Sequence, residues 1–287
     1  MRALAEFIMR GRLQAALVAA VGNLVPVVST ATVGLVALRR GMLDGLLILF
    51  WAALPVIVLG SVTSGVNLLL MVATGAALLV VLLAAEVLKQ TVSWSYTLLV
   101  SLLGTALATG LMSGVFPEQV SQLESALAAF FQEVSQQSGE NADLIMPTKA
   151  MLLGVVAYVT LLNVVVSLLV ARWWQSMLYN PGGFRSEMHG FRMQVYPAII
   201  LMAGVVGCYF YQPDYAGWAS FLGLPLLMGG LCLLHYLVAA TAMGVHWLVL
   251  VYVGIVLFGP LTLLLMFVGL ADSLLNLRSR IIPKGDS

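Results

Sequence analysis

Long apolar runs without charge constrain this chain more than any other feature. Four of them, Leu68–Ala85, Leu98–Val115, Met151–Val170 and Val195–Tyr211, approach the ~20 residues that an α-helix needs to cross a bilayer. The mean hydropathy of +1.04 leaves too little polar surface for a soluble globule. Alternating strand patterns are absent from the sequence. We therefore predict an all-α bundle, one transmembrane domain over residues 1–287, with about eight membrane-spanning segments.

The charged residues predict how the chain threads the membrane. Lysine and arginine stay on the cytoplasmic side of membrane proteins. Residues 117–146 hold five acidic residues and no base, and their apolar residues recur at helical spacing. We expect this segment to be an external amphipathic helix. Both termini, including a tail over residues 277–287, are then cytoplasmic. An N-terminal signal peptide fits less well than a retained segment, because the apolar pattern resumes after Pro26.

Two segments must turn back on themselves if all the basic clusters except Lys149 are inside. Residues 13–38 run between arginines at both ends, including the pair Arg39 and Arg40, and are interrupted by Gly22, Asn23 and Pro26. Residues 247–276 are interrupted by Gly259 and Pro260. Half of the first segment would span roughly 20 Å, short of a ~30 Å hydrocarbon core. We predict broken or re-entrant hairpins; straight crossings with the arginine pair outside are the alternative.

A polar stretch over residues 171–194 separates two apolar runs. Arg172 is expected to end a helix at the cytoplasmic side, with Trp173 and Trp174 in the interfacial aromatic belt. The residues that follow favour a turn, since proline presets φ and glycine accepts positive φ; they are Asn180, Pro181, Gly182 and Gly183. A short amphipathic helix then begins near Phe184. We interpret the stretch as a cytoplasmic elbow and not as a catalytic site.

Signatures of catalysis and of cofactor binding are missing from the sequence. No HExxH, GxSxG or Walker motif occurs, so we expect neither an enzyme nor a bound cofactor. His189, His235 and His246 are too far apart in sequence to predict a metal cluster. Cys208 and Cys232 lie in apolar runs, where cysteine packs as a small hydrophobe. A formal net charge of +1 gives no reason to expect nucleic acid.

Polar residues within apolar runs are the candidate ligand contacts, because each is costly in lipid. Interrupted helices in transporters hold substrate near the middle of the bilayer. The candidates are Asn23, Ser29, Thr30, Asn163, His235 and Tyr236. Two simpler interpretations stay open: a plain proline kink satisfied by neighbouring helices, and a His235 ring that only bonds an adjacent helix. Asp272 precedes Arg278 by about two helical turns, which predicts an ion pair near the interface.

Small residues at helical spacing let helices approach closely. Ala15 with Ala19, and Gly110 with Gly114, are such pairs, and they fit a contact within the protein or against a partner.

Several motifs resemble those of the YybS-like bacterial membrane proteins, a family of unknown function. They are LVALRRG (35–41), RWWQSMLYNPGGF (172–184), LLHYL (233–237) and the segment 258–280, FGPLTLLLMFVGLADSLLNLRSR. That family is in turn similar to the S components of energy-coupling factor transporters, which bind vitamins or metal ions. In S components an AxxxA face of the first helix docks the energising subunit, and Ala15 and Ala19 match it in kind. S components usually have fewer helices than this chain.

The resemblance implies an inner-membrane protein that binds or transports a small molecule. The alternative is a non-transporting scaffold that presents its cytoplasmic loop and external helix to partner proteins. Lipid surrounds the bundle in both cases.

Overall fold

The computed structural model describes residues 1–287 except 26, 63–65, 139–146, 212, 242 and 281–287, and these described residues form helices and short connections without a strand. The α-helices are α1 (Arg2–Arg10), α2 (Arg12–Val21), α3 (Val28–Arg40), α4 (Met42–Val62), α5 (Val66–Thr91), α6 (Trp94–Val115), α7 (Pro117–Ser138), α8 (Lys149–Tyr179), α9 (Gly183–Gly190), α10 (Val195–Tyr211), α11 (Ala216–Ala240), α12 (His246–Leu257) and α13 (Gly259–Leu275). Three 3-10 turns are η1 (Gly22–Leu24), η2 (Pro213–Tyr215) and η3 (Leu277–Arg280). The all-α prediction is confirmed.

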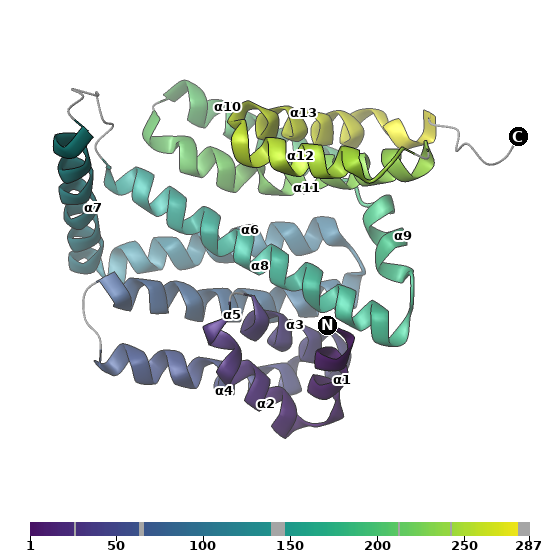
Figure 1. Cartoon of the computed structure of the whole chain (residues 1–287), viewed down its shortest axis with the longest axis horizontal. Coiled ribbons are helices and arrows are strands. Elements are labelled where there is room, and N and C mark those ends of the chain that lie inside the picture. Colours follow the sequence, from purple (N-terminus) through teal and green to yellow (C-terminus); the bar gives the residue numbers. More distant parts are fainter. Residues whose placement is uncertain (26, 63–65, 139–146, 212, 242, 281–287) are drawn as a thin grey trace, which may run out of the picture.

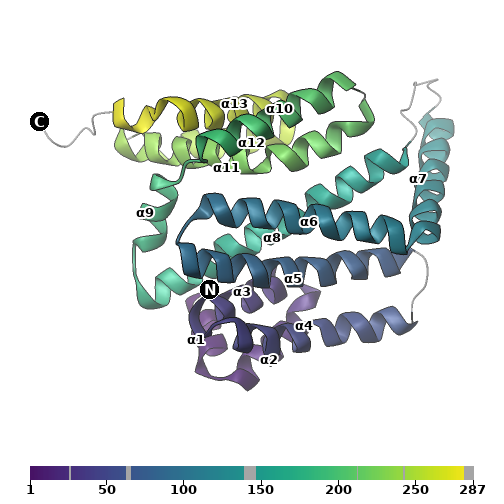
Figure 2. The same ribbon diagram turned by 180° about the vertical axis from the view of Figure 1, so that it is seen from behind.

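Most of the long helices run along one common direction. Figures 1 and 2 show α7 lying across one end of this bundle and α9 at the other. The helices form two groups, α1–α7 and α10–α13, and α8 lies between them, because it packs against α3 and α5 on one side and α11 on the other. We call the two ends of the bundle the α7 end and the elbow end.

Five described helices are long and apolar enough to cross a membrane: α4, α5, α6, α8 and α11 with its preceding turn. The bent pair α9 and α10, with an angle of 68° between the helices, would make a sixth such span. α12 and α13 are apolar but shorter, at 12 and 17 residues. The structure thus supports a membrane protein with five or six spans of full length.

The first broken segment reverses direction. α2 ends at Val21 and α3 begins at Val28, one on each side of the predicted break; Pro26 lies outside the described residues. Nη2 of Arg40 donates to the carbonyl oxygen of Met9 at 2.8 Å, and Nη2 of Arg12 pairs with Oδ1 of Asp44 at 2.7 Å. The start and the end of the segment therefore lie together in the fold.

The last apolar segment is broken one residue before the predicted position. Phe258, whose backbone is not helical, separates α12 from α13, and Gly259 and Pro260 begin the second helix. Proline fits there because the first turn of a helix does not need its N–H. α12 and α13 lie side by side in both views (Figures 1 and 2).

Basic residues are more frequent at the elbow end of the bundle than at the α7 end, where Lys149 begins α8. Arg39, Lys89 and Arg172 stand at or near helix ends on the elbow side, whereas Glu118 and Glu124 belong to α7. The inner face of α7 packs through the buried Val120 and its apolar neighbours against α5, α6 and α8. This position matches a surface helix lying across the bundle. The remainder of the predicted external segment, residues 139–146, lies outside the described residues.

The alanine face of α2 is used within the protein. Ala15 and Ala19 are fully buried, and α2 packs on α3 and α4. Of the two contacts that the spacing predicts, the structure shows the one within the protein for Ala15 and Ala19. Gly110 and Gly114 of α6, in contrast, have open space where a Cβ would stand.

Two glycines allow the backbones of α11 and α13 to touch. A Cβ on Gly269 would collide with the carbonyl oxygen of Leu226, and a Cβ on Gly230 with that of Leu265. Backbone atoms cannot yield as a flexible side chain can, so both positions require glycine.

We expect Gly269→Ala to destabilise the protein by about 1–3 kcal/mol, because the added methyl forces α11 and α13 apart. The matched control is Gly110→Ala on α6, where a Cβ meets nothing within 4 Å. In the control, the higher helix propensity of alanine predicts no loss of stability. Thermal unfolding in one mild detergent compares them; equal midpoints for both variants would contradict the close crossing.

Candidate functional site

The predicted ligand contacts fall into two separate pockets. Asn23, Ser29, Thr30 and Asn163 line a cavity of about 250 Å³ between the first break, α5 and α8, which we call the break pocket. His235 lines a larger cavity of about 480 Å³ at the elbow end, the elbow pocket. The structure therefore does not bring the first hairpin and His235 together, because α8 stands between α3 and α11.

Side chains of the break pocket mainly satisfy the interrupted backbone. Nδ2 of Asn23 donates to the carbonyl oxygen of Ala52 at 2.8 Å and more weakly to α2. Oγ of Ser29 donates to the carbonyl oxygen of Ala19 at 2.7 Å. These bonds supply partners that lipid cannot. They support the simpler interpretation of the break as a satisfied kink.

Thr30 ties the break to α8. Its hydroxyl lies 2.6 Å from that of Ser167 and 3.4 Å from Oδ1 of Asn163. Most polar atoms of the predicted site are thus already engaged within the protein. Val27 next to them has φ of +76°, which is unusual for a β-branched residue.

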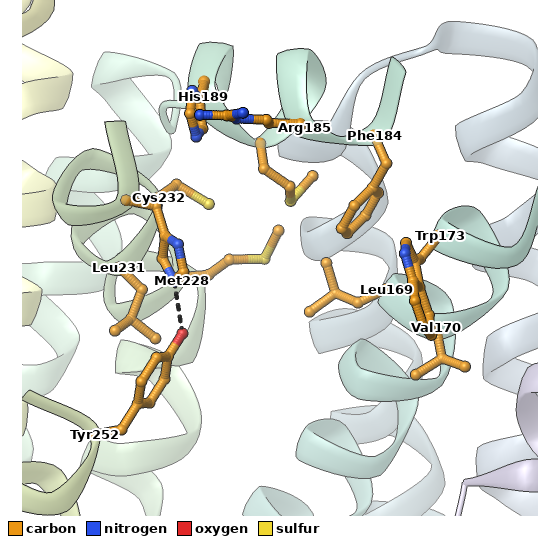
Figure 3. A pocket seen from close by; sticks show the side chains of 12 residues that line it. Leu169, Val170, Trp173, Phe184, Arg185, His189, Met228, Leu231, Cys232 and Tyr252 are labelled. Carbon is orange, nitrogen blue, oxygen red and sulfur yellow. Dashed lines mark hydrogen bonds between the residues drawn. The ribbon is translucent and has the colours of Figure 1, made fainter. Parts of the chain in front are cut away.

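The elbow pocket lies where the two helix groups meet. α8, α9, α11 and α12 contribute its walls, and Figure 3 shows α8 side chains facing α11 side chains across the cavity. The lining is largely apolar. Its residues are Leu169, Val170, Trp173, Phe184, Arg185, Met188, His189, Met228, Leu231, Cys232, His235 and Tyr252.

A hydrogen bond crosses one wall of the elbow pocket. Nε2 of His235 on α11 lies 2.8 Å from the hydroxyl of Tyr252 on α12. His235 thus has a hydrogen-bond partner on an adjacent helix, as the simpler interpretation of this residue expects. Both rings nevertheless line the cavity, and Tyr252 keeps 46% of its surface exposed (Figure 3). A ligand in the cavity would therefore meet the pair.

Tyr236 does not line the elbow pocket. Its ring packs edge to face against the ring of His189, with 6.1 Å between centroids, and the guanidinium of Arg278 lies 5.8 Å from its centroid. Tyr236 belongs to the contact between α11, α9 and η3 and not to the cavity.

Arg185 and His189 stand together at the α9 side of the cavity (Figure 3). Burial lowers the pKa of His189, and the positive charges of Arg185, His235 and Arg278 add to this effect. Arg185 is exposed and has no ion-pair partner among the described residues.

Two ion pairs hold the elbow in place. Arg172 on α8 donates to both carboxylate oxygens of Glu187 on α9, at 3.0 and 2.6 Å, and Nε1 of Trp94 on α6 adds a bond of 3.3 Å to the same carboxylate. Asp272, fully buried, lies 3.3 Å from Nε of Arg278, whose Nη1 also donates to the carbonyl oxygen of His189. α9 is thereby fastened to α6, α8 and η3.

The elbow begins later than the sequence predicts. α8 continues past Arg172 to Tyr179, because Trp174 packs into the core with only 1% of its surface exposed. Trp174 is thus not in the interfacial belt, whereas Trp173 is 40% exposed and lines the cavity. The last residue of this extension of α8, Tyr179, contacts α3: the guanidinium of Arg39 lies 4.2 Å from the centroid of its ring.

The predicted turn follows α8 directly. The N–H of Gly183 donates to the carbonyl oxygen of Asn180 at 3.0 Å, and Gly182 has φ of +88° and ψ of −19°. With Pro181 at the second position, these angles fit a type II turn, which requires positive φ at its third residue.

Tyr252 and Arg185 are the pocket residues that sequence reasoning missed. Tyr252 lies in a uniformly apolar run, and Arg185 lies in the polar stretch 171–194 with no pattern that predicts a binding site. The hydroxyl of a tyrosine in such a run needs a hydrogen-bond partner, which was the available signal for a contact with His235. Groups of three or more His, Cys, Asp or Glu placed to hold a metal ion do not occur within the described ranges.

No family model, curated protein or solved structure matches this chain. The similarity to YybS-like proteins and S components stays a prediction from the motifs alone.

Replacing Gly182 by alanine should cost about 1–2 kcal/mol of stability, because an L-residue at positive φ brings its Cβ against the following carbonyl. Open space surrounds this position, so the backbone alone causes the loss. Gly190→Ala, near the end of the same elbow and equally open, is the control and should change little. Unfolding midpoints of the two variants test this. If Gly182→Ala were as stable as the control, the turn would have another geometry.

Proposed function

We propose that this chain is an integral protein of the bacterial cytoplasmic membrane that binds a small molecule in the elbow pocket, as the binding step of transport in the manner of an S component. One observation carries the proposal: an apolar cavity of about 480 Å³ whose polar groups gather on few positions. Ligand pockets typically have this size and this distribution of polarity.

The elbow pocket supports binding better than the break pocket does. The break pocket is about half as large, and its amide and hydroxyl groups are largely engaged in bonds that hold α2, α3 and α8 together. In the elbow pocket, Arg185 and the rings of His189 and His235 border an otherwise apolar space. Such a lining can accept a mostly apolar molecule and orient it.

Basic residues at the elbow end favour a cytoplasmic location for this end. The proposed topology places α7 outside, with the first and last hairpins both entering from the cytoplasm. The cavity would then lie near the inner interface of the bilayer, within reach of the cytoplasm and of lipid.

Ligand-dependent thermal stabilisation of the purified full chain tests the proposal. A panel of vitamins, nucleobases and long-chain acids and alcohols is added separately to protein in neutral detergent. A compound that binds should stabilise the fold by about 2.7 kcal/mol at a concentration of 100 times its Kd. Leu231→Trp, which fills the cavity, should abolish this stabilisation.

Leu107→Trp is the matched control, since Leu107 is exposed on α6 and is not among the residues that line the cavity. It should leave the ligand response intact. Failure of every compound to stabilise the native chain, or an undiminished response in Leu231→Trp, would refute binding in this pocket.

A scaffold function is the second candidate, favoured by α7. Phe130, on this helix at the end of the bundle, leaves 59% of its surface exposed. An aromatic residue on the outer surface suits an anchor for another protein. Copurification in mild detergent distinguishes the two: a partner retained by the native chain and lost with Phe130→Ser supports the scaffold, and a reproducible monomer opposes it.

A further inference from the structure

We propose that the ligand of the elbow pocket is an anionic amphiphile, with a carboxylate or phosphate group at Arg185 and an apolar tail between α8 and α11. This inference rests on the proposed function and names the class of molecule that the pocket takes.

The charge of the lining points to an anion. Arg185 is the permanent cation among the residues that line the pocket, and no aspartate or glutamate is among them. A cationic ligand would meet this guanidinium without a compensating carboxylate. An anionic group would instead gain a charge-assisted hydrogen bond, for which the planar guanidinium is well suited.

Arg185 differs from Arg172 and Arg278, the arginines that form the two ion pairs of the elbow. Arg172 is held by Glu187, with a shortest distance of 2.6 Å, and Arg278 lies 3.3 Å from Asp272. The charge of each of these two arginines is already paired with a carboxylate of the protein. Glu187 is two residues from Arg185, and residues at that spacing do not share a helix face. The guanidinium of Arg185 therefore remains available beside the cavity (Figure 3).

The body of the cavity suits a hydrocarbon tail. Leu169 and Val170 of α8 form one wall, and Met228 and Leu231 of α11 form the other, facing them across the space in Figure 3. Methionine side chains adapt to irregular apolar ligands. The polar pair His235 and Tyr252 is already hydrogen bonded, so it adds little charge to this wall. Polarity therefore differs between the Arg185 side of the pocket and its walls, as it does along an amphiphile.

The position of the pocket agrees with this orientation. Trp173, amphipathic and 40% exposed, lines the cavity as Arg185 does and belongs to the elbow end. Tryptophan settles at the boundary between hydrocarbon and headgroups. A headgroup at Arg185 would lie at this boundary, with its tail directed toward the apolar interior.

Binding of matched amphiphiles to the full-length protein tests the inference. Laurate, dodecyl phosphate and the neutral dodecanol share one chain length, and inorganic phosphate supplies the headgroup without a tail. In one neutral detergent, we expect both anions to bind about tenfold more tightly than dodecanol, the size of one charge-assisted hydrogen bond. Phosphate alone should give no thermal shift. Thermal stability of the protein in nanodiscs of phosphatidylglycerol is then compared with that in nanodiscs of phosphatidylcholine, to test whether a phospholipid can be the source of the anion.

Arg185→Gln should reduce the affinity for both anions to that for dodecanol, while binding of dodecanol is kept. Arg185→Lys should retain a preference for anions, and Arg280→Gln, which removes an exposed charge at the same end outside the lining, should behave as the native chain.

Equal affinity for the anions and dodecanol, or an anion preference that survives Arg185→Gln, would overturn the inference and leave small-molecule binding in place. A preference equally reduced by Arg280→Gln would also overturn it, since attraction would then come from the charge of the whole end. If none of the three amphiphiles binds, the inference fails; the wider panel decides the proposed function separately.

Discussion

Within hydrocarbon, a backbone group that leaves the helical pattern finds no water, and this constraint governs the fold around the first break. Asn23 and Ser29 donate to carbonyl oxygens of α2 and α4, and the break is thereby closed from within the protein. α3 can then enter the interior, where every residue from Ser29 to Leu38 is buried. α2, α4, α5 and α8 all pack against it. The packing of α3 thus depends on the polar residues near the break, whether or not they also contact a ligand.

The second helix group depends on close backbone contact. Gly230 and Gly269 let α11 and α13 touch, and the buried pair of Asp272 and Arg278 fixes the end of α13 against α9. An unpaired partner of such a pair would be expensive in a medium of low dielectric constant, so the two charges hold each other there. At the elbow end a cavity lies between α8 and α11, and α9 lines one side of it (Figure 3).

Local patterns predicted the helices well, because apolar length and helix breakers act within a few residues. The breaks near Asn23 and at Phe258 follow from residues beside them in the sequence. The length of α8 does not follow from neighbouring residues in this way. Trp174 is buried by helices distant in sequence, and this burial outweighs the polar composition of the last turns of α8. The grouping of site residues was likewise beyond the sequence. Polar residues were identified one by one, but whether His235 lies with the first hairpin or with Tyr252 depends on tertiary packing alone.

The elbow helix combines two tasks through the spacing of its charges. Glu187 faces α8 and binds Arg172, so α9 is held firmly across the end of the cavity. Arg185, two residues earlier, points from another face of the same helix and borders the cavity with its charge unpaired among the described residues. A carboxylate that paired with both Arg172 and Arg185 would neutralise the charge of the pocket. If α9 were not fixed to α8, the guanidinium of Arg185 would have no defined position beside the cavity. The position of the Arg185 guanidinium therefore depends on the pairing of Glu187 with Arg172, and the elbow helix places the charge on which the proposed anion binding rests.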